Sequence, residues 1–346
     1  MLYAPGLGYY AAGSPKLALR SHQDKSSLVG DFVTAPELSP AFGRTLARQI
    51  LQVMREQGLT QILEFGAGSG QLACDILQFL QDHNETHIQY SILEISSDLR
   101  ARQKDLLAHA GLEAHWLDRI PENFEGVILA NEVLDAMPVH VLRWSSDSVV
   151  FERGVINQDE GFAWQDRPAN EILAHTLANY MPALPGYITE INLQAQAWTR
   201  TVASHLRKGL ILLIDYGFTQ QEYYHPQRST GTLMCHIQHR AHDDPFFAPG
   251  LQDITAHVDF SAIAASAHSA NLDVLGYASQ ARFLLNAGLH DELLQNPDLQ
   301  STQHLRRIEK LLSEAEMGEL FKVLALGKGI DSDLVGFCRG DRRHQL

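Results

Sequence analysis

A glycine turn between a short apolar run and a helical pattern is the feature that most constrains the fold. Residues 61–65 (QILEF) are mostly apolar, residues 66–70 read GAGSG, and residues 72–80 carry apolar side chains at helical spacing. Gly66, Gly68 and Gly70 let a ligand approach the backbone, because no Cβ atom intervenes and peptide N–H groups at a helix start point toward it. The segment predicts a strand, a ligand-binding turn and a helix.

Short apolar runs alternate with helical patterns through much of the chain. Strand-like runs occupy residues 90–95, 115–117, 127–130, 210–214, 272–277 and 321–326, and helical patterns occupy residues 40–57, 98–110 and 193–206. Strands that alternate with helices form a parallel sheet covered on both faces. We therefore predict an α/β, Rossmann-like fold with a seven-stranded sheet.

Two segments interrupt this alternation. The runs HVLRW, SVVFERGVI and QDEGFAWQDRP predict a β-hairpin insertion, and the stretch from Tyr216 to Phe260 is too long and too aromatic for an ordinary connection. The expected organisation is an N-terminal lid loop and helix (1–57), a cofactor-binding half (58–137), a β-rich insertion (138–186), a core helix with the fifth strand (187–216), a substrate-side excursion (217–270) and C-terminal strands with a helix (271–346).

Two acidic residues, one just before the glycine turn and one at the end of the next strand run, indicate a nucleotide-like cofactor. Glu64 precedes Gly66 by two residues, and Glu94 ends the next strand run, where a carboxylate can accept hydrogen bonds from ribose hydroxyls. The spacing G-x-G-x-G differs from the dinucleotide fingerprint, and a carboxylate at position 64 opposes a pyrophosphate but favours the ammonium of S-adenosylmethionine. NAD remains the alternative. Asp118, after the third run, is a weaker candidate for the adenine amino group.

Polar side chains after the fourth and fifth strands are candidates for the chemistry. Asn131, Glu132 and Asp135 lie in the segment NEVLDAMP, where carboxylates could hold a guanidinium and align one nitrogen with a methyl group. The alternative is a helix cap made by Asn131 or Asp135, with Glu132 near the helix dipole. Asp215 and Tyr216 end the fifth strand and either orient the substrate or cap a turn.

The excursion contains a thiol and three imidazoles that suggest a metal site. Cys235, His236, His239 and His242 are zinc-type ligands, but the spacing does not keep three side chains on one face of a helix or strand. We expect no metal. His239 is instead a candidate for contacting the substrate or bracing the loop.

Composition limits the partners. The chain has 346 residues, with 41 acidic against 27 basic residues and a formal charge of −14, which disfavours nucleic acid and anionic lipid and suits a cationic peptide. Three scattered cysteines and the absence of a signal segment or a long apolar run lead us to expect a cytoplasmic protein without membrane insertion. The sequence leaves the oligomeric state open, with a homodimer as one option.

Taken together, several motifs resemble the MidA-like family of S-adenosylmethionine-dependent methyltransferases. These are GDFVTAPELSPAFG, LEFGAGSGQLACDIL, LEIS, LANEVLDAMPVHV, LLIDYG and GTLMCHIQHRAHDDPFFAPGLQDITAHVDF. The resemblance implies a class I methyltransferase core, with Gly66, Gly68, Gly70 and Glu94 at the cofactor. It places the loop that contains Asp31, Phe32, Thr34, Pro36 and Glu37, together with NEVLDAMP, near the acceptor.

The resemblance also implies a target. The mitochondrial members are complex I assembly factors that methylate a protein arginine, so we expect a bacterial relative that methylates an arginine of a partner protein. Family members begin with a longer helical lead, so we expect a shortened start. The alternatives are an assembly chaperone that binds S-adenosylmethionine without essential catalysis, and an NAD-dependent oxidoreductase.

Overall fold

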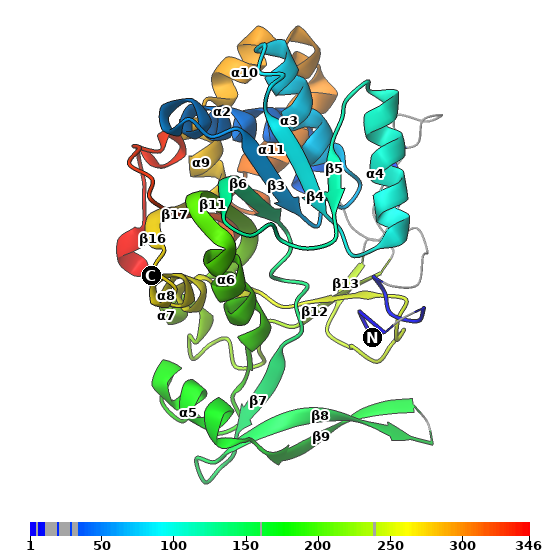
Figure 1. Cartoon of the computed structure of the whole chain (residues 1–346). Coiled ribbons are helices and arrows are strands. Elements are labelled where there is room, and N and C mark those ends of the chain that lie inside the picture. Colours follow the sequence, from blue (N-terminus) through cyan, green and yellow to red (C-terminus); the bar gives the residue numbers. More distant parts are fainter. Residues whose placement is uncertain (5, 11–18, 21–27, 30–33, 160, 238–239) are drawn as a thin grey trace.

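A central sheet organises the molecule. The computed structural model describes residues 1–4, 6–10, 19–20, 28–29, 34–159, 161–237 and 240–346 (Figure 1). Seven of the described strands lie side by side in the order β16 (Asp273–Ser279), β17 (Phe321–Lys328), β11 (Leu206–Phe218), β6 (Phe124–Asn131), β3 (Gln61–Phe65), β4 (Gln89–Leu93) and β5 (His115–Leu117), and the two-residue strand β15 (Val258–Asp259) joins the sheet as an eighth at the end of β11. Strand β17 runs antiparallel to both neighbours, whereas the other pairs from β11 to β5 are parallel. This arrangement confirms the predicted seven-stranded α/β core.

The strand predictions hold best where apolar runs stop abruptly. Strands β3 and β5 have the predicted bounds, because polar or glycine residues end both runs. Strand β11 is longer than the run at 210–214, since the residues from Leu206 onward also pair with β6, through a register shift at Leu206/Lys208. Its carboxyl end continues to Phe218, where it pairs with β15 (Val258–Asp259).

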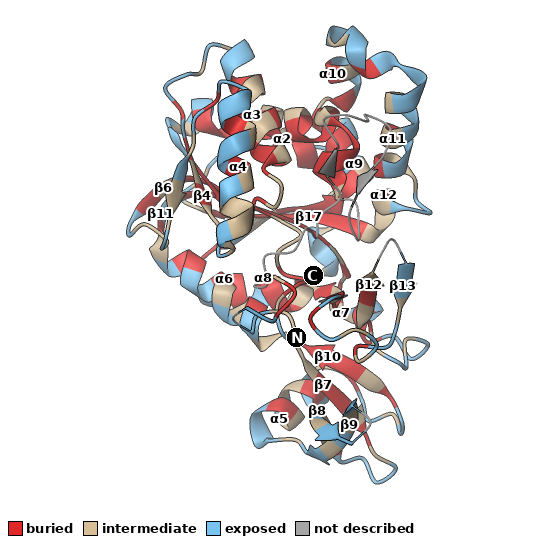
Figure 2. Ribbon diagram, turned by 90° about the vertical axis from the view of Figure 1, so that its right-hand side faces the viewer, coloured by how far each residue is buried: buried red, intermediate tan, exposed pale blue. Residues whose placement is uncertain are grey.

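Helices cover both faces of the sheet because successive strand residues point in opposite directions. Ile62 of β3 belongs to a core shared with α2 (Pro40–Gln57) and α3 (Gln71–Asp82), and Leu63 belongs to a core shared with α6 (Leu193–His205) and α8 (Phe260–Ser269). Helix α4 (Ser97–His109) contributes Leu107 to the first core. Figure 2 shows that buried residues concentrate on the strands and on the inner faces of these helices.

Helix α2 shows how local signals set an element's ends. Pro40 occupies its first turn, and the Ser39 hydroxyl accepts a hydrogen bond from the Ala41 N–H at 3.3 Å. The helix ends at Gly58, whose φ of 67° is left-handed. These signals explain why the bounds of α2 agree with the predicted range.

The insertion is larger than the predicted hairpin. Strands β8 (Val150–Gln158) and β9 (Gly161–Pro168) do form a hairpin, but β7 (His140–Trp144) and β10 (Ile188–Ile191) extend it to a four-stranded antiparallel sheet in the order β10-β7-β8-β9. Helix α5 (Glu171–Tyr180) packs on this sheet through Leu173 and Leu177. The predicted core segment 187–216 therefore begins with a strand of the insertion sheet, which lies below the core in Figure 1.

The excursion after β11 is ordered by a second small sheet. It contains α7 (Gln220–Tyr223) and strands β12 (Met234–Ile237), β13 (Arg240–His242) and β14 (Asp253–Thr255), paired in the order β13-β12-β14. Glu190 of β10 holds the chain just before β12. Its buried carboxylate accepts hydrogen bonds at 2.9 Å from both the N–H and the hydroxyl of Thr232.

The remaining elements lie near the two ends of the chain. A cluster of helices joins β16 to β17, and α1 (Ala35–Leu38) precedes α2. The cluster comprises α9 (Gln280–Asn286), α10 (Leu289–Gln295), η1 (Pro297–Gln300), α11 (Thr302–Leu312) and α12 (Met317–Leu320); the other short elements are β1 (Leu19–Arg20), β2 (Leu28–Val29), η2 (Val335–Phe337) and η3 (Arg343–Gln345). In the part of the chain that the structure describes, no helix has the length and apolar character needed to cross a bilayer.

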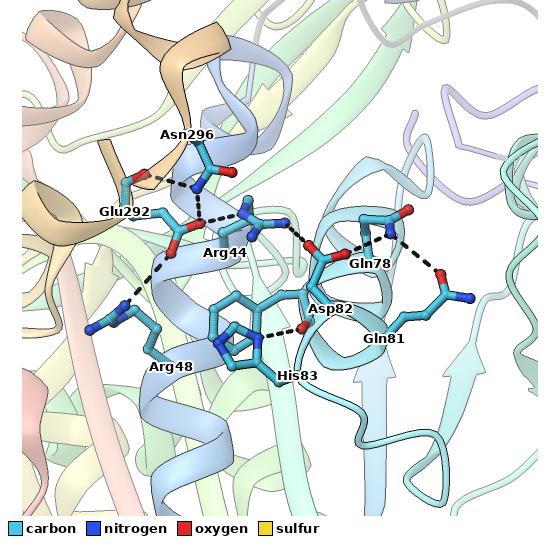
Figure 3. Close-up of polar contacts among 9 residues, drawn as sticks. Arg44, Arg48, Gln78, Gln81, Asp82, His83, Glu292 and Asn296 are labelled. Carbon is cyan, nitrogen blue, oxygen red and sulfur yellow. Dashed lines mark hydrogen bonds and ion pairs between the residues drawn. The ribbon is translucent and has the colours of Figure 1, made fainter. Parts of the chain in front are cut away.

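An ion-pair cluster joins α10 to α2 and α3 (Figure 3). The buried carboxylate of Glu292 contacts the Arg44 guanidinium, lies 3.8 Å from Arg48 and accepts a hydrogen bond from the Asn296 amide at 2.7 Å. Arg44 also binds Asp82 of α3 at 2.9 Å. The cluster therefore holds α10 against α2 and α3, although Arg44 and Glu292 lie about 250 residues apart in the sequence.

We expect Glu292→Gln to lower the free energy of unfolding by about 2–3 kcal/mol, because it leaves the largely buried Arg44 guanidinium with Asp82 as its remaining acidic partner. Urea denaturation measures this change. Asp291→Asn is the matched control, since Asp291 is exposed and pairs with Arg48 at 3.4 Å, and we expect it to cost less than about 0.5 kcal/mol. Equal losses in the two variants would contradict this interpretation.

Candidate active site

The glycine turn joins β3 to α3 in a conformation that side chains disfavour. Gly66, Gly68 and Gly70 have φ values of 60°, 55° and 89°. A Cβ atom on Gly66 would lie 3.3 Å from the Val133 side chain, and one on Gly70 would lie 3.2 Å from Gln103. Glycine at these positions therefore keeps the turn tight against its neighbours and leaves its outer side open.

A cleft of about 940 Å³, counted out to its open mouth, lies at the carboxyl ends of β3, β4 and β6. In open α/β sheets this edge is where ligands bind. The cleft brings together most of the residues that the sequence predicted for the site. Those that line it are Thr34, Pro36, Glu37, Glu64, Gly66, Gly68, Glu94, Asn131 and Glu132.

Glu94 is held in the cleft by a network that the sequence did not reveal. Its carboxylate accepts hydrogen bonds from the Ser96 N–H at 2.9 Å and from the Gln103 amide at 3.0 Å. The Gln103 amide also donates to the Gly68 carbonyl at 2.9 Å, and its oxygen accepts from Trp116. Gln103 is a fully buried polar residue one turn before Leu107 on α4, and its place on that buried stripe was the available signal. It fixes the acid relative to the glycine turn.

Glu64 is a buried carboxyl group beside the turn. The Tyr90 hydroxyl donates a hydrogen bond to it at 2.9 Å. Burial, aided by the nearby negative charge of Glu94, raises the pKa of Glu64 to about 8. The folded protein therefore keeps the Glu64 carboxyl group protonated to a higher pH than an ordinary glutamate.

Glu132 lies at the end of β6 with a strained backbone. Its φ is 52°, which non-glycine residues rarely adopt, and its N–H donates to the Ile214 carbonyl at 2.9 Å. The Asn131 amide donates to its carboxylate at 3.1 Å, and the backbone of Ala35 also hydrogen-bonds it. Burial and the neighbouring Asp135 raise its pKa to about 8. Glu132 lines the cleft in this conformation.

Asp215 shapes the turn that carries Asp135. Its carboxylate accepts hydrogen bonds from the N–H groups of Leu134, Asp135 and Tyr216 at 3.0, 3.2 and 2.9 Å. Burial and the charges of Asp135 and Glu132 raise its pKa well above the ordinary value. These contacts agree with the turn-capping alternative for Asp215.

Asp135 is buried but keeps an oxygen free. Burial raises its pKa to about 6, although Tyr216 and the backbone of Ala136 hydrogen-bond its carboxylate. Among the described residues, Asp135 Oδ1 has no hydrogen-bond partner. Since buried acceptors are normally satisfied, this oxygen is available to a donor from outside the chain.

The other predicted residues have different positions. The Ser69 hydroxyl donates to Glu37. Asp118 is exposed, does not line the cleft and pairs with Arg100 at 2.7 Å, so the structure does not bring it to the site. Asp31, Phe32 and His239 lie outside the described residues. Tyr216 packs edge-on against His257 at 5.1 Å between ring centroids.

Two tyrosines of the first ten residues also line the cleft, which the sequence did not indicate. The Tyr3 hydroxyl donates to the Ala136 carbonyl and the Tyr10 hydroxyl donates to Asp253, both at 2.8 Å. Their rings stack at 5.6 Å. The Gly- and Tyr-rich start of the chain was the available signal, but its contacts are with residues more than 130 positions away.

The residues considered for a metal do not form a ligand set in the described part of the chain. Cys235 is buried, and burial together with nearby aspartates raises the pKa of its thiol to about 12. Its partner across the strands is His242. Within the described residues, no group of three or more His, Cys, Asp or Glu side chains is arranged to hold a metal ion.

Comparisons with known proteins decide between the two cofactor classes. Residues 45–278 match the model of a family described as "Putative S-adenosyl-L-methionine-dependent methyltransferase". The chain belongs to this methyltransferase family. The predicted use of S-adenosylmethionine is thereby confirmed, in preference to the alternative of an NAD-dependent oxidoreductase.

Relatives of this methyltransferase extend over nearly its whole length. A crystal structure from Burkholderia thailandensis, bound to S-adenosyl-homocysteine, is 48% identical with a TM-score of 0.92 and covers 100% of this chain and 90% of that chain. The mitochondrial protein arginine methyltransferase NDUFAF7 homolog of Drosophila melanogaster is 26% identical over 92% of this chain and 79% of its own length. The human protein of that name is also 26% identical, over 94% and 78%.

Proposed function

We propose that this methyltransferase transfers a methyl group from S-adenosylmethionine to an arginine side chain of a partner protein. The observation that carries the proposal is the pair of acids at the end of β6, half-buried Glu132 and buried Asp135, with the Oδ1 atom of Asp135 free among the described residues. A guanidinium is the side-chain group that best satisfies two adjacent carboxylates. The curated relatives named as protein arginine methyltransferases support the same acceptor.

The cleft fits the cofactor. Gly66 and Gly68 line it in left-handed conformations, so a ligand can lie against the backbone of the turn where no side chain intervenes. Glu64 and Glu94 face the same space, and burial raises the pKa of both carboxyl groups. Two acids beside the glycine turn suit a ligand with a cationic ammonium and paired hydroxyls. We assign Glu64 to the methionine ammonium and Glu94 to the ribose hydroxyls.

The residues of the chain supply alignment and exclusion of water. When bound, the cofactor supplies an activated methyl group on a sulfonium. Asp135 and Glu132 would hold the guanidinium so that one nitrogen points at that methyl group. Asp135 Oδ1, which has no hydrogen-bond partner among the described residues, would accept the proton that the methylated nitrogen releases. Tyr3 and Tyr10 limit the access of water to the cleft.

The charge of the chain favours a cationic partner. A formal charge of −14 attracts a segment rich in arginine or lysine, and this attraction weakens with salt. Cys74, Cys235 and Cys338 are free thiols, which is consistent with the proposed location in the reducing cytoplasm of a bacterium.

The test is methyl transfer into proteins. We expect the purified protein, given methyl-labelled S-adenosylmethionine and a lysate of the source organism without the gene, to label a protein band. Hydrolysis of that band should release labelled methylarginine. Label in small molecules alone, or in a residue other than arginine, would overturn the proposal.

A further inference from the structure

A second cavity lies next to the cofactor cleft, and Tyr3 lines both. It encloses about 1200 Å³, counted out to its open mouth, and lies between the insertion sheet, the excursion and residues 1–4. Val155 and Trp164 contribute from the insertion, and Phe246 and Thr255 contribute from the excursion. The two long segments that interrupt the core in the sequence therefore build one cavity together.

The walls of this cavity are aromatic and apolar. The rings of Trp164 and Phe246 lie 5.0 Å apart, and the Arg153 guanidinium lies 5.5 Å from the Trp164 ring. Arg153 also donates to Asp166 at 3.0 Å, and Asp166 accepts a second hydrogen bond from Arg143 at 2.7 Å. The rings of this wall present apolar faces on which the side chain of an arginine can pack.

Asp135 and Tyr3 connect the cavity to the cofactor cleft. Asp135 lines the second cavity, Ala136 lines the cleft, and Tyr3 lines both. Asp135 is only 5% exposed, and its Oδ1 atom has no hydrogen-bond partner among the described residues. A hydrogen-bond donor that enters the second cavity can therefore reach Asp135 Oδ1, close to the boundary between the cavity and the cofactor cleft.

We propose that the second cavity binds an extended, arginine-bearing segment of the partner protein, with the arginine reaching Asp135 between the insertion and the excursion. This inference rests on the proposed methyl transfer. An acceptor nitrogen must approach the methyl group from the side opposite the sulfur, so it needs an entrance other than the cleft that the cofactor fills. The negative field of the chain and the carboxylate of Asp135 match the positive segment.

Blocking the mouth of the cavity tests this route. Val155 is 49% exposed and lines the cavity, whereas Phe162, on the neighbouring strand of the same hairpin, is 45% exposed and does not. Val155→Cys and Phe162→Cys are each made in a Cys338→Ser background, which removes the exposed native thiol. Each variant is coupled to a polyethylene-glycol maleimide. Both are then compared for S-adenosylhomocysteine affinity and for labelling of protein arginine in the lysate.

We expect coupling at position 155 to reduce arginine labelling about 10-fold or more, with S-adenosylhomocysteine affinity unchanged, and coupling at position 162 to have little effect. Equal labelling by both coupled variants would overturn the entrance while leaving the methyl transfer intact. Failure of the uncoupled wild-type protein to label arginine would instead overturn the proposed function, and the entrance with it. Weaker cofactor binding after coupling at 155 would also contradict a separate acceptor cavity.

Discussion

Asp135→Asn should reduce the rate of methyl transfer to protein by about 100- to 1000-fold, because a charge-assisted hydrogen bond to a buried carboxylate contributes about 3–4 kcal/mol to holding the acceptor. The substitution keeps the size of the side chain and its contact with Tyr216, so the turn held by Asp215 should remain folded. Initial rates of label incorporation into the methylated protein band measure the loss. Titration calorimetry should show that S-adenosylhomocysteine affinity changes by less than about 3-fold.

The matched control is Asp147→Asn. Asp147 is an exposed aspartate in the turn between β7 and β8, so this variant makes the same change of net charge away from the site. We expect its rate to equal that of the wild-type protein at physiological salt. A wild-type rate for Asp135→Asn would show that Asp135 does not hold the acceptor. A loss of cofactor affinity in that variant would assign it to the cofactor instead.

Glu64→Gln should stabilise the protein without cofactor while weakening cofactor binding. The pKa of Glu64 is raised from 4.5 to about 8, so the folded protein keeps this proton while the unfolded chain releases it. The unfolding free energy of the wild-type protein therefore falls as the pH rises from about 4.5 to 8. Glutamine does not titrate and still accepts the Tyr90 hydrogen bond, so at pH 8 we expect the variant to be more stable by about 1–3 kcal/mol.

The same substitution removes the negative partner proposed for the methionine ammonium. We expect the affinity for S-adenosylhomocysteine, which carries that ammonium, to fall about 10- to 100-fold at pH 8. Thus Glu64 would lower the stability of the cofactor-free protein and would also bind the ligand. Urea denaturation at pH 5 and pH 8 and titration calorimetry measure the two effects.

Glu113→Gln is the control for this experiment, because Glu113 is exposed and distant from the cleft. We expect no change in either measurement. If Glu64→Gln gave the same stability difference at pH 5 and pH 8, the stabilisation would not arise from ionisation of the buried carboxyl group. If it left affinity unchanged, Glu64 would not contact the ligand.

The sequence by itself determined the core and the centre of the cleft. Periodicity located α2, β3 and β5, because the burial of an element repeats with its own geometry and a few local residues end it. The turn from Gly66 to Gly70 and the acid Glu94 could also be located, since both depend on the end of a parallel strand. The resemblance added Thr34, Pro36 and Glu37, which line the cleft.

Only the tertiary structure decided how distant side chains share the site. Gln103 joins Glu94 to Gly68 across 35 residues, Asp215 holds a turn 80 residues earlier, and Tyr3 reaches Ala136 across 133 residues. It also decided that Asp118 pairs with Arg100 at the surface, and that the insertion is a four-stranded sheet whose Trp164 meets Phe246. Local patterns record burial and turns, whereas these contacts depend on how packed elements bring remote segments together, which no nearby residue specifies.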